Sequence, residues 1–207
     1  MTISFSGPGL WYATRAAGLV TLLLLTGSAL LGILTAGRLA APRWPRFLIV
    51  GLHRNLALLA VAFLALHVGT TVLDSYTSIP LSAAFVPFLS PYKRLWLALG
   101  AGALDLLVVL VATSLVRGRL GYRGWRLVHW AGYACWPLAV AHGAGAGTDE
   151  HSTWAVALTV ACVTAVATAA AWRLLRRWPE RRVLRLSMVA VTAVGVPVVL
   201  SLGGYQW

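Results

Sequence analysis

Charged residues are scarce in this chain. They make up 11% of its 207 residues, and only five side chains are acidic. Apolar residues account for 59%, and the mean hydropathy is +0.80. A soluble domain has roughly a quarter of its residues charged, so this composition excludes an ordinary soluble enzyme or binding module. We expect a membrane protein.

Cysteine is nearly absent as well. The two cysteines, Cys135 and Cys162, both lie in apolar segments, and neither belongs to a Cys-x-x-Cys-His motif. This excludes covalent attachment of a c-type haem and argues against a structural disulfide. Both side chains are expected to be small packing residues.

Long polar stretches are also missing. Six apolar segments each reach the length of about 20 residues that crosses a bilayer. They lie at roughly 10–36, 47–73, 95–116, 124–146, 153–175 and 183–202. The connections are too short for a soluble nucleotide- or flavin-binding domain. We therefore expect an all-α membrane protein, a six-transmembrane-helix bundle forming a single domain over residues 1–207.

The net charge of +12 comes from basic residues that gather in alternate connections. They are Arg38, Arg43, Arg46, Arg117, Arg119, Arg123, Arg126, Arg173, Arg176, Arg177, Arg181, Arg182 and Arg185. Basic residues concentrate in cytoplasmic loops, so the odd-numbered connections are expected inside and both termini outside. This pattern predicts a multi-pass protein of the cell membrane, surrounded by lipid, and no nucleic-acid partner.

Four histidines lie within the apolar segments. His53 and His67 share the second segment, and His129 and His142 share the fourth. Ionisable residues at membrane depth are costly and usually functional. At about 1.5 Å per residue the members of each pair are roughly 20 Å apart along a helix, which gives two levels. His53 would face His129 near the cytoplasm and His67 would face His142 near the outside, as two stacked b-type haems require. Hydrogen bonding between helices is the alternative role of such histidines.

Helical phase places His53 and His67 on one face of their segment, but not His129 and His142. Fourteen steps of about 100° bring His67 to within roughly 40° of His53. Thirteen steps leave His142 about 140° from His129 in an ideal helix. Pro137 lies between these two and can kink or rewind the segment.

Other residues suit a haem site without being specific to it. Arg54 and Arg126 lie beside the inner histidines and could hold haem propionates, although both also obey the positive-inside rule. Five glycines close to the histidines in sequence leave room for a flat macrocycle or for close helix packing: Gly51, Gly69, Gly132, Gly143 and Gly145. Asp105 stands mid-segment, where a carboxylate would be protonated, hydrogen-bonded or part of a proton path.

The paired spacing His53-x13-His67 and His129-x12-His142, with Thr14-Arg15-Ala16-Ala17-Gly18 in the opening segment, resembles the ferric reductase-like transmembrane domain. The resemblance covers about residues 12–178 and leaves 183–202 as an extra C-terminal span. That superfamily includes ferric reductases, NADPH oxidases and the haem-bearing membrane subunit of a bacterial methionine sulfoxide reductase system.

The resemblance implies two b-type haems, an inner one on His53 and His129 and an outer one on His67 and His142. Family reductases and oxidases add a cytoplasmic flavin- and nicotinamide-binding half. We find no such site in this chain, so we expect a separate donor, a flavoprotein or a quinol. Family oxidases tend to place a further histidine one turn beyond the outer ligand, where this chain has Thr71.

The sequence thus predicts di-haem electron transfer to an extracytoplasmic acceptor, as the electron-transfer component of an oxidoreductase. One alternative is a quinol-linked cytochrome b subunit of a larger complex. Another is a proton or ion transporter without haem that uses the histidines and Asp105. A structural assembly factor is a third possibility.

Overall fold

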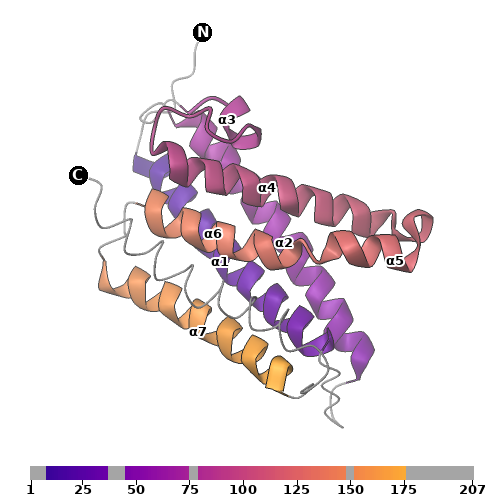
Figure 1. Cartoon of the computed structure of the whole chain (residues 1–207). Coiled ribbons are helices and arrows are strands. Elements are labelled where there is room, and N and C mark those ends of the chain that lie inside the picture. Colours follow the sequence, from indigo (N-terminus) through magenta and orange to yellow (C-terminus); the bar gives the residue numbers. More distant parts are fainter. Residues whose placement is uncertain (1–7, 37–44, 75–78, 148–151, 176–207) are drawn as a thin grey trace. The chain divides into compact units, whose positions relative to one another are not determined.

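The computed structural model describes residues 8–36, 45–74, 79–147 and 152–175. Throughout these ranges the regular secondary structure is helical (Figure 1). The helices are α1 (Pro8–Ala36), α2 (Arg46–Leu73), α3 (Ser82–Phe85), α4 (Arg94–Leu115), α5 (Arg117–His129), α6 (Gly132–Ala146) and α7 (Thr153–Leu175). The expected all-α fold is confirmed for this part of the chain.

Four of the helices, α1, α2, α4 and α7, are long and apolar enough to cross a membrane. Their bounds lie within two residues of the segments expected at 10–36, 47–73, 95–116 and 153–175. A helix satisfies its backbone hydrogen bonds internally, which lipid requires of any spanning segment. The chain is therefore a multi-pass membrane protein. The expected sixth span, 183–202, and both termini lie outside the described residues, so the count of six spans is not confirmed.

The fourth expected span, 124–146, is wrong as a single helix. The chain forms α5 and α6 instead, with a turn at Trp130 and Ala131 between them. The backbone N–H groups of Ala131, Tyr133 and Ala134 donate to carbonyls three residues earlier, at 2.9, 3.0 and 2.9 Å. Trp130 has φ −66° and ψ −23°, and Ala131 has φ −60° and ψ −19°. Both the bonds and the dihedrals are those of a 3₁₀ turn.

This turn changes the phase between His129 and His142. A 3₁₀ turn advances about 120° per residue and an α-helix about 100°, so each 3₁₀ residue adds roughly 20°. Three such residues add about 60°, which reduces the 140° gap that an ideal helix leaves to roughly 80°. Pro137, which was considered as a place where the segment can kink or rewind, lies inside a continuous α6. The phase change occurs directly after His129.

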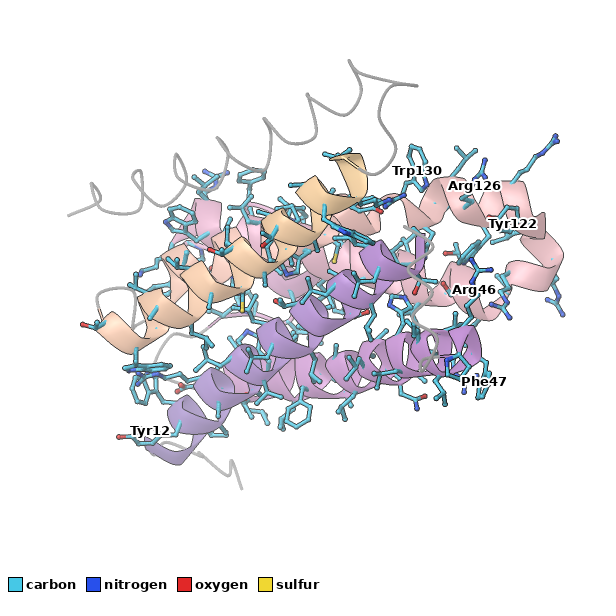
Figure 2. All side chains as sticks on the ribbon, turned by 90° about the horizontal axis from the view of Figure 1, so that it is seen from below. Tyr12, Arg46, Phe47, Tyr122, Arg126 and Trp130 are labelled. Carbon is cyan, nitrogen blue, oxygen red and sulfur yellow. The ribbon has the colours of Figure 1, made fainter. Side chains whose placement is uncertain are left out.

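α5 differs in character from the spanning helices. It carries four arginines, which explains why it does not continue the apolar run of α6. Gly121 has φ +68°, a conformation that bends the helix and that side chains rarely tolerate. Figure 2 shows Tyr122 and Arg126 projecting from this helix, and the Arg126 guanidinium lies 5.4 Å from the centre of the Tyr122 ring. That distance suits a cation–π contact.

The chain divides into two compact units whose boundaries fall inside α1 and α2. One unit consists of residues 1–19 and 63–147, and the other of residues 20–62 and 148–207. In the first unit α4 lies beside α6 (Figure 1), and their contact buries Trp96, Ala103, Leu107, Leu110, Cys135, Trp136 and Val140. Apolar side chains buried in the second unit are Leu22, Ile33, Ala60, Cys162 and Val166.

Candidate metal-binding histidines

His67 and His142 face one another within the first unit, although 75 positions separate them in sequence. Their ring centres are 6.2 Å apart, with the ring planes at 76°. A metal–imidazole bond is about 2 Å long and the ring centre lies about 1 Å further, so two imidazoles on opposite sides of one metal have centres about 6 Å apart. The separation of the two rings therefore fits a metal held between them, as in bis-imidazole haem.

Each of these two rings is fixed by a backbone carbonyl of a neighbouring helix. His67 Nδ1 lies 2.8 Å from the carbonyl oxygen of Thr14 in α1. His142 Nδ1 lies 2.9 Å from the carbonyl oxygen of Trp96 in α4. A carbonyl can only accept a hydrogen bond, so Nδ1 is the donor in both rings. The proton on Nδ1 leaves the Nε2 lone pair for a metal, which is the usual arrangement of histidine ligands.

Each ring also rests on a glycine of the same neighbouring helix. A Cβ atom added at Gly18 would lie 3.1 Å from Cε1 and Nδ1 of His67. At Gly100 it would lie 2.6 to 2.9 Å from Nδ1, Cε1 and Cγ of His142. Real Cβ atoms essentially never come within 3.0 Å of such atoms. The rings therefore occupy space that a side chain at either position would need.

His53, in the second unit, has the same kind of surroundings. Its Nδ1 lies 2.9 Å from the carbonyl oxygen of Ser28 and 3.1 Å from the Ser28 hydroxyl. A Cβ atom at Gly32 would lie 3.6 Å from its Cε1, which is ordinary contact. Three of the four expected ligands thus share one arrangement, in which a backbone carbonyl accepts a hydrogen bond from Nδ1 and a glycine lies beside the ring.

His129 has different neighbours. Its ring stacks on that of Trp125, with centres 4.7 Å apart and planes at 25°. Trp125 is held in turn, because its Nε1–H donates to the Ser114 hydroxyl at 3.2 Å. His129 belongs to the first unit and His53 to the second, so their expected pairing stays a prediction.

The other expected site residues are less constrained. Arg54 is exposed on α2, Arg126 is exposed beside Tyr122 on α5, and Asp105 is half-buried on α4. Cys135 and Cys162 are buried free thiols, as expected. Within the described ranges no three His, Cys, Asp or Glu side chains gather into one group.

Sequence reasoning missed the glycines that touch the histidines. It selected glycines close to the histidines in sequence, yet a Cβ at Gly51, Gly69 or Gly143 would meet no described atom within 4 Å. The contacting glycines stand on other helices. One feature of the sequence could have identified two of them. Gly18 and Gly32 are 14 residues apart, which is the same separation as that of His53 and His67, the histidines they contact.

The comparison with known protein families gives one match. The family model described as "Ferric reductase like transmembrane component" matches residues 16–140. No curated protein and no solved structure matches the chain. The matched region contains α2, α4 and α5 with three of the four histidines, and it ends inside α6, two residues before His142. It spans more than half of the 207 residues, and the chain therefore belongs to the family of ferric reductase like transmembrane components.

Proposed function

We propose that this membrane domain carries electrons across the bilayer through two b-type haems. His67 and His142 would hold one haem, and His53 and His129 the other. Membership of the ferric reductase-like family supports transmembrane electron transfer. The observation that carries the haem proposal is the His67–His142 pair, with ring centres 6.2 Å apart and each Nδ1 on a backbone carbonyl. When bound, haem supplies one-electron redox chemistry.

The chain's own residues define what such a site can do. His67 and His142 would together hold the haem through their Nε2 atoms and would keep substrate and water from binding its iron. The hydrogen bonds from Nδ1 make the Nε2 atom of each imidazole a stronger electron-pair donor to a metal, and they restrict rotation of the ring. The apolar helices keep water away. These properties suit electron transfer at fixed geometry and leave no position for bond-making at the metal.

The direction and the partners are part of the same proposal. Arg126 and Arg54, beside the inner histidines in sequence, are candidates to hold haem propionates by charge-assisted hydrogen bonds. Electrons would enter from a cytoplasmic flavoprotein or from a quinol and leave to an extracytoplasmic acceptor. Residues 1–207 would form one haem-binding domain of the cell membrane, including the extra span at 183–202.

The test is a haem titration with histidine variants. Wild-type protein is purified in detergent after expression with added haem, and haem per chain is measured from the reduced-minus-oxidised spectrum. We expect about two low-spin haems per chain, and one after His67→Ala or His142→Ala. The double variant should lose no more haem than either single variant, because both residues hold the same group. His151→Ala, which changes a histidine outside the proposed set, is the control and should keep both haems.

A folded protein without haem would contradict the proposal. Ion-flux measurements with Asp105→Asn would then test the transporter alternative. Additional loss of haem in the double variant would contradict the pairing of His67 with His142 while leaving haem binding itself intact. Co-purification of further subunits and a semiquinone signal would favour the quinol-linked cytochrome b alternative.

A further inference from the structure

The three histidines with carbonyl partners contact their neighbouring helices at residues of one repeated spacing. His67 contacts Thr14 and Gly18, His53 contacts Ser28 and Gly32, and His142 contacts Trp96 and Gly100. In every case the carbonyl stands at position i and the glycine at i+4. The arrangement occurs twice on α1 and once on α4.

Helix geometry explains why the glycine stands four residues after the carbonyl. Residues i and i+4 lie on the same helix face, one turn apart. Each Cα–Cβ bond leans toward the helix N-terminus, so a side chain at i+4 covers the surface above the carbonyl of residue i. An imidazole that donates to this carbonyl from outside comes close to the Cβ position of residue i+4. A Cβ would clash with the ring at Gly100, would be tight at Gly18 and would make ordinary contact at Gly32. Glycine at i+4 leaves this space empty.

The carbonyl can serve two donors at once. In an α-helix it already accepts the N–H of residue i+4, and a second lone pair remains for a donor from outside. Apolar spans offer few other acceptors to a buried imidazole, and an unsatisfied N–H in such surroundings is costly. The glycine therefore gives Nδ1 access to an acceptor that every helix contains but that side chains normally cover.

The register of α4 against the chain from α5 to α6 predicts a different arrangement for the fourth histidine. Ser114 of α4 contacts Trp125, and Leu110 of α4 lies beside Gly132. His129 lies between Trp125 and Gly132 in sequence, so it faces the stretch of α4 around residues 110–114. The positions that correspond to Trp96 and Gly100 are then Val109 and Thr113. The Thr113 hydroxyl donates to the Val109 carbonyl at 2.7 Å. This position carries a side chain in place of the glycine.

We propose that Gly18 and Gly100 are positioning residues for the His67–His142 pair. Each exposes a backbone carbonyl, at Thr14 or Trp96, that holds Nδ1 of the opposing imidazole and directs its Nε2 toward a shared metal. The inference rests on the proposed function, because it assigns how that site is oriented. It adds two residues that touch neither metal nor substrate and that act only through the histidines.

The experiment compares Gly100→Ala with Gly102→Ala, two changes of the same kind in α4. A Cβ at Gly102 would meet only Leu138 Cδ1, at 3.9 Å, so this control tests helix and packing effects alone. Alanine favours a helix more than glycine does, so intrinsic helix propensity cannot explain a loss. We expect Gly100→Ala to weaken haem binding at one of two sites by about 10–100-fold, as is typical when the partner of a metal-bound histidine is lost. Gly102→Ala should keep two haems with unchanged spectra.

Gly18→Ala provides a second and milder test. Its Cβ would lie 3.1 Å from His67, so the ring must shift by a few tenths of an ångström and the haem should remain. A weaker Nδ1–H bond makes the imidazole a poorer donor to ferric iron, so the midpoint potential of one haem should rise and its low-spin g values should change. If Gly100→Ala does not fold, the potential and g values of Gly18→Ala alone test the inference.

Unchanged haem content in Gly100→Ala together with unchanged potential and g values in Gly18→Ala would overturn the inference. Equal losses in Gly100→Ala and Gly102→Ala would also overturn it, because the effect would then be general packing. Failure of the proposed function is distinguishable, since wild-type protein would then contain no haem for either variant to change.

Discussion

Two glycines of α6, Gly143 and Gly145, should respond very differently to substitution by alanine, as measured by the stability of the protein. Gly145 is buried against Trp96, and a Cβ there would overlap three ring atoms of the indole. Trp96 is only 6% exposed, so its rigid ring has little room to move. Gly143 stands two residues earlier and is exposed, and a Cβ there would meet no described atom within 4 Å.

The two substitutions should change stability in opposite directions. Alanine in place of glycine stabilises a helix by about 0.5–1 kcal/mol, which is the expected gain for Gly143→Ala. Overpacking costs about 1–3 kcal/mol, and overlap with a rigid ring points to the upper end, so Gly145→Ala should lose about 2 kcal/mol net. The free energies of unfolding of the two variants then differ by about 3 kcal/mol, or roughly 6–12 °C in Tm for a chain of this size.

Thermal unfolding in detergent, followed by tryptophan fluorescence, measures this difference. Gly145→Ala should also weaken haem binding to the His67–His142 pair, because the Trp96 carbonyl that holds His142 moves with its residue. Equal melting temperatures for the two variants, or a higher one for Gly145→Ala, would refute the packing described for α4 and α6.

Three further outcomes follow from single features of the chain. Gly121→Ala should destabilise the protein by about 1–3 kcal/mol in chemical unfolding, because φ is +68° there, whereas Gly118→Ala should be neutral or mildly stabilising. His142→Gly should lose one of two haems and regain it on addition of free imidazole, and absence of rescue would count against ligation by this residue. The thiols of Cys135 and Cys162 are buried, so both should react with a maleimide only after unfolding, and rapid labelling of the folded protein would contradict their burial.

The four long helices were predictable because their apolar runs are long enough to cross a bilayer and carry few charges. The division of the segment 124–146 was not predicted. Its signal was present in Arg126 and in the three arginines just before the segment, which make α5 unlike a lipid-facing helix. The exact place of the break depends on local 3₁₀ bonds at Trp130 and Ala131, and no residue type there demands them.

The candidate site was predictable only in part. Histidines are easily recognised in an apolar segment, and the closeness of His67 to His142 was predicted from their similar depth in the membrane. Their hydrogen-bond partners did not, because the acceptors are backbone carbonyls that every residue possesses. The glycines that expose these carbonyls were detectable only as a spacing of 14 residues, shared by Gly18 with Gly32 and by His53 with His67.

Electron transfer across a sealed membrane tests the central claim most directly. Purified protein is reconstituted into liposomes that enclose ferricyanide, and dithionite is added outside as a donor that does not cross the bilayer. We expect the enclosed ferricyanide to be reduced by liposomes containing wild-type protein, and far more slowly by liposomes containing His67→Ala protein or none. Equal rates in all three preparations would contradict transmembrane electron transfer by this chain.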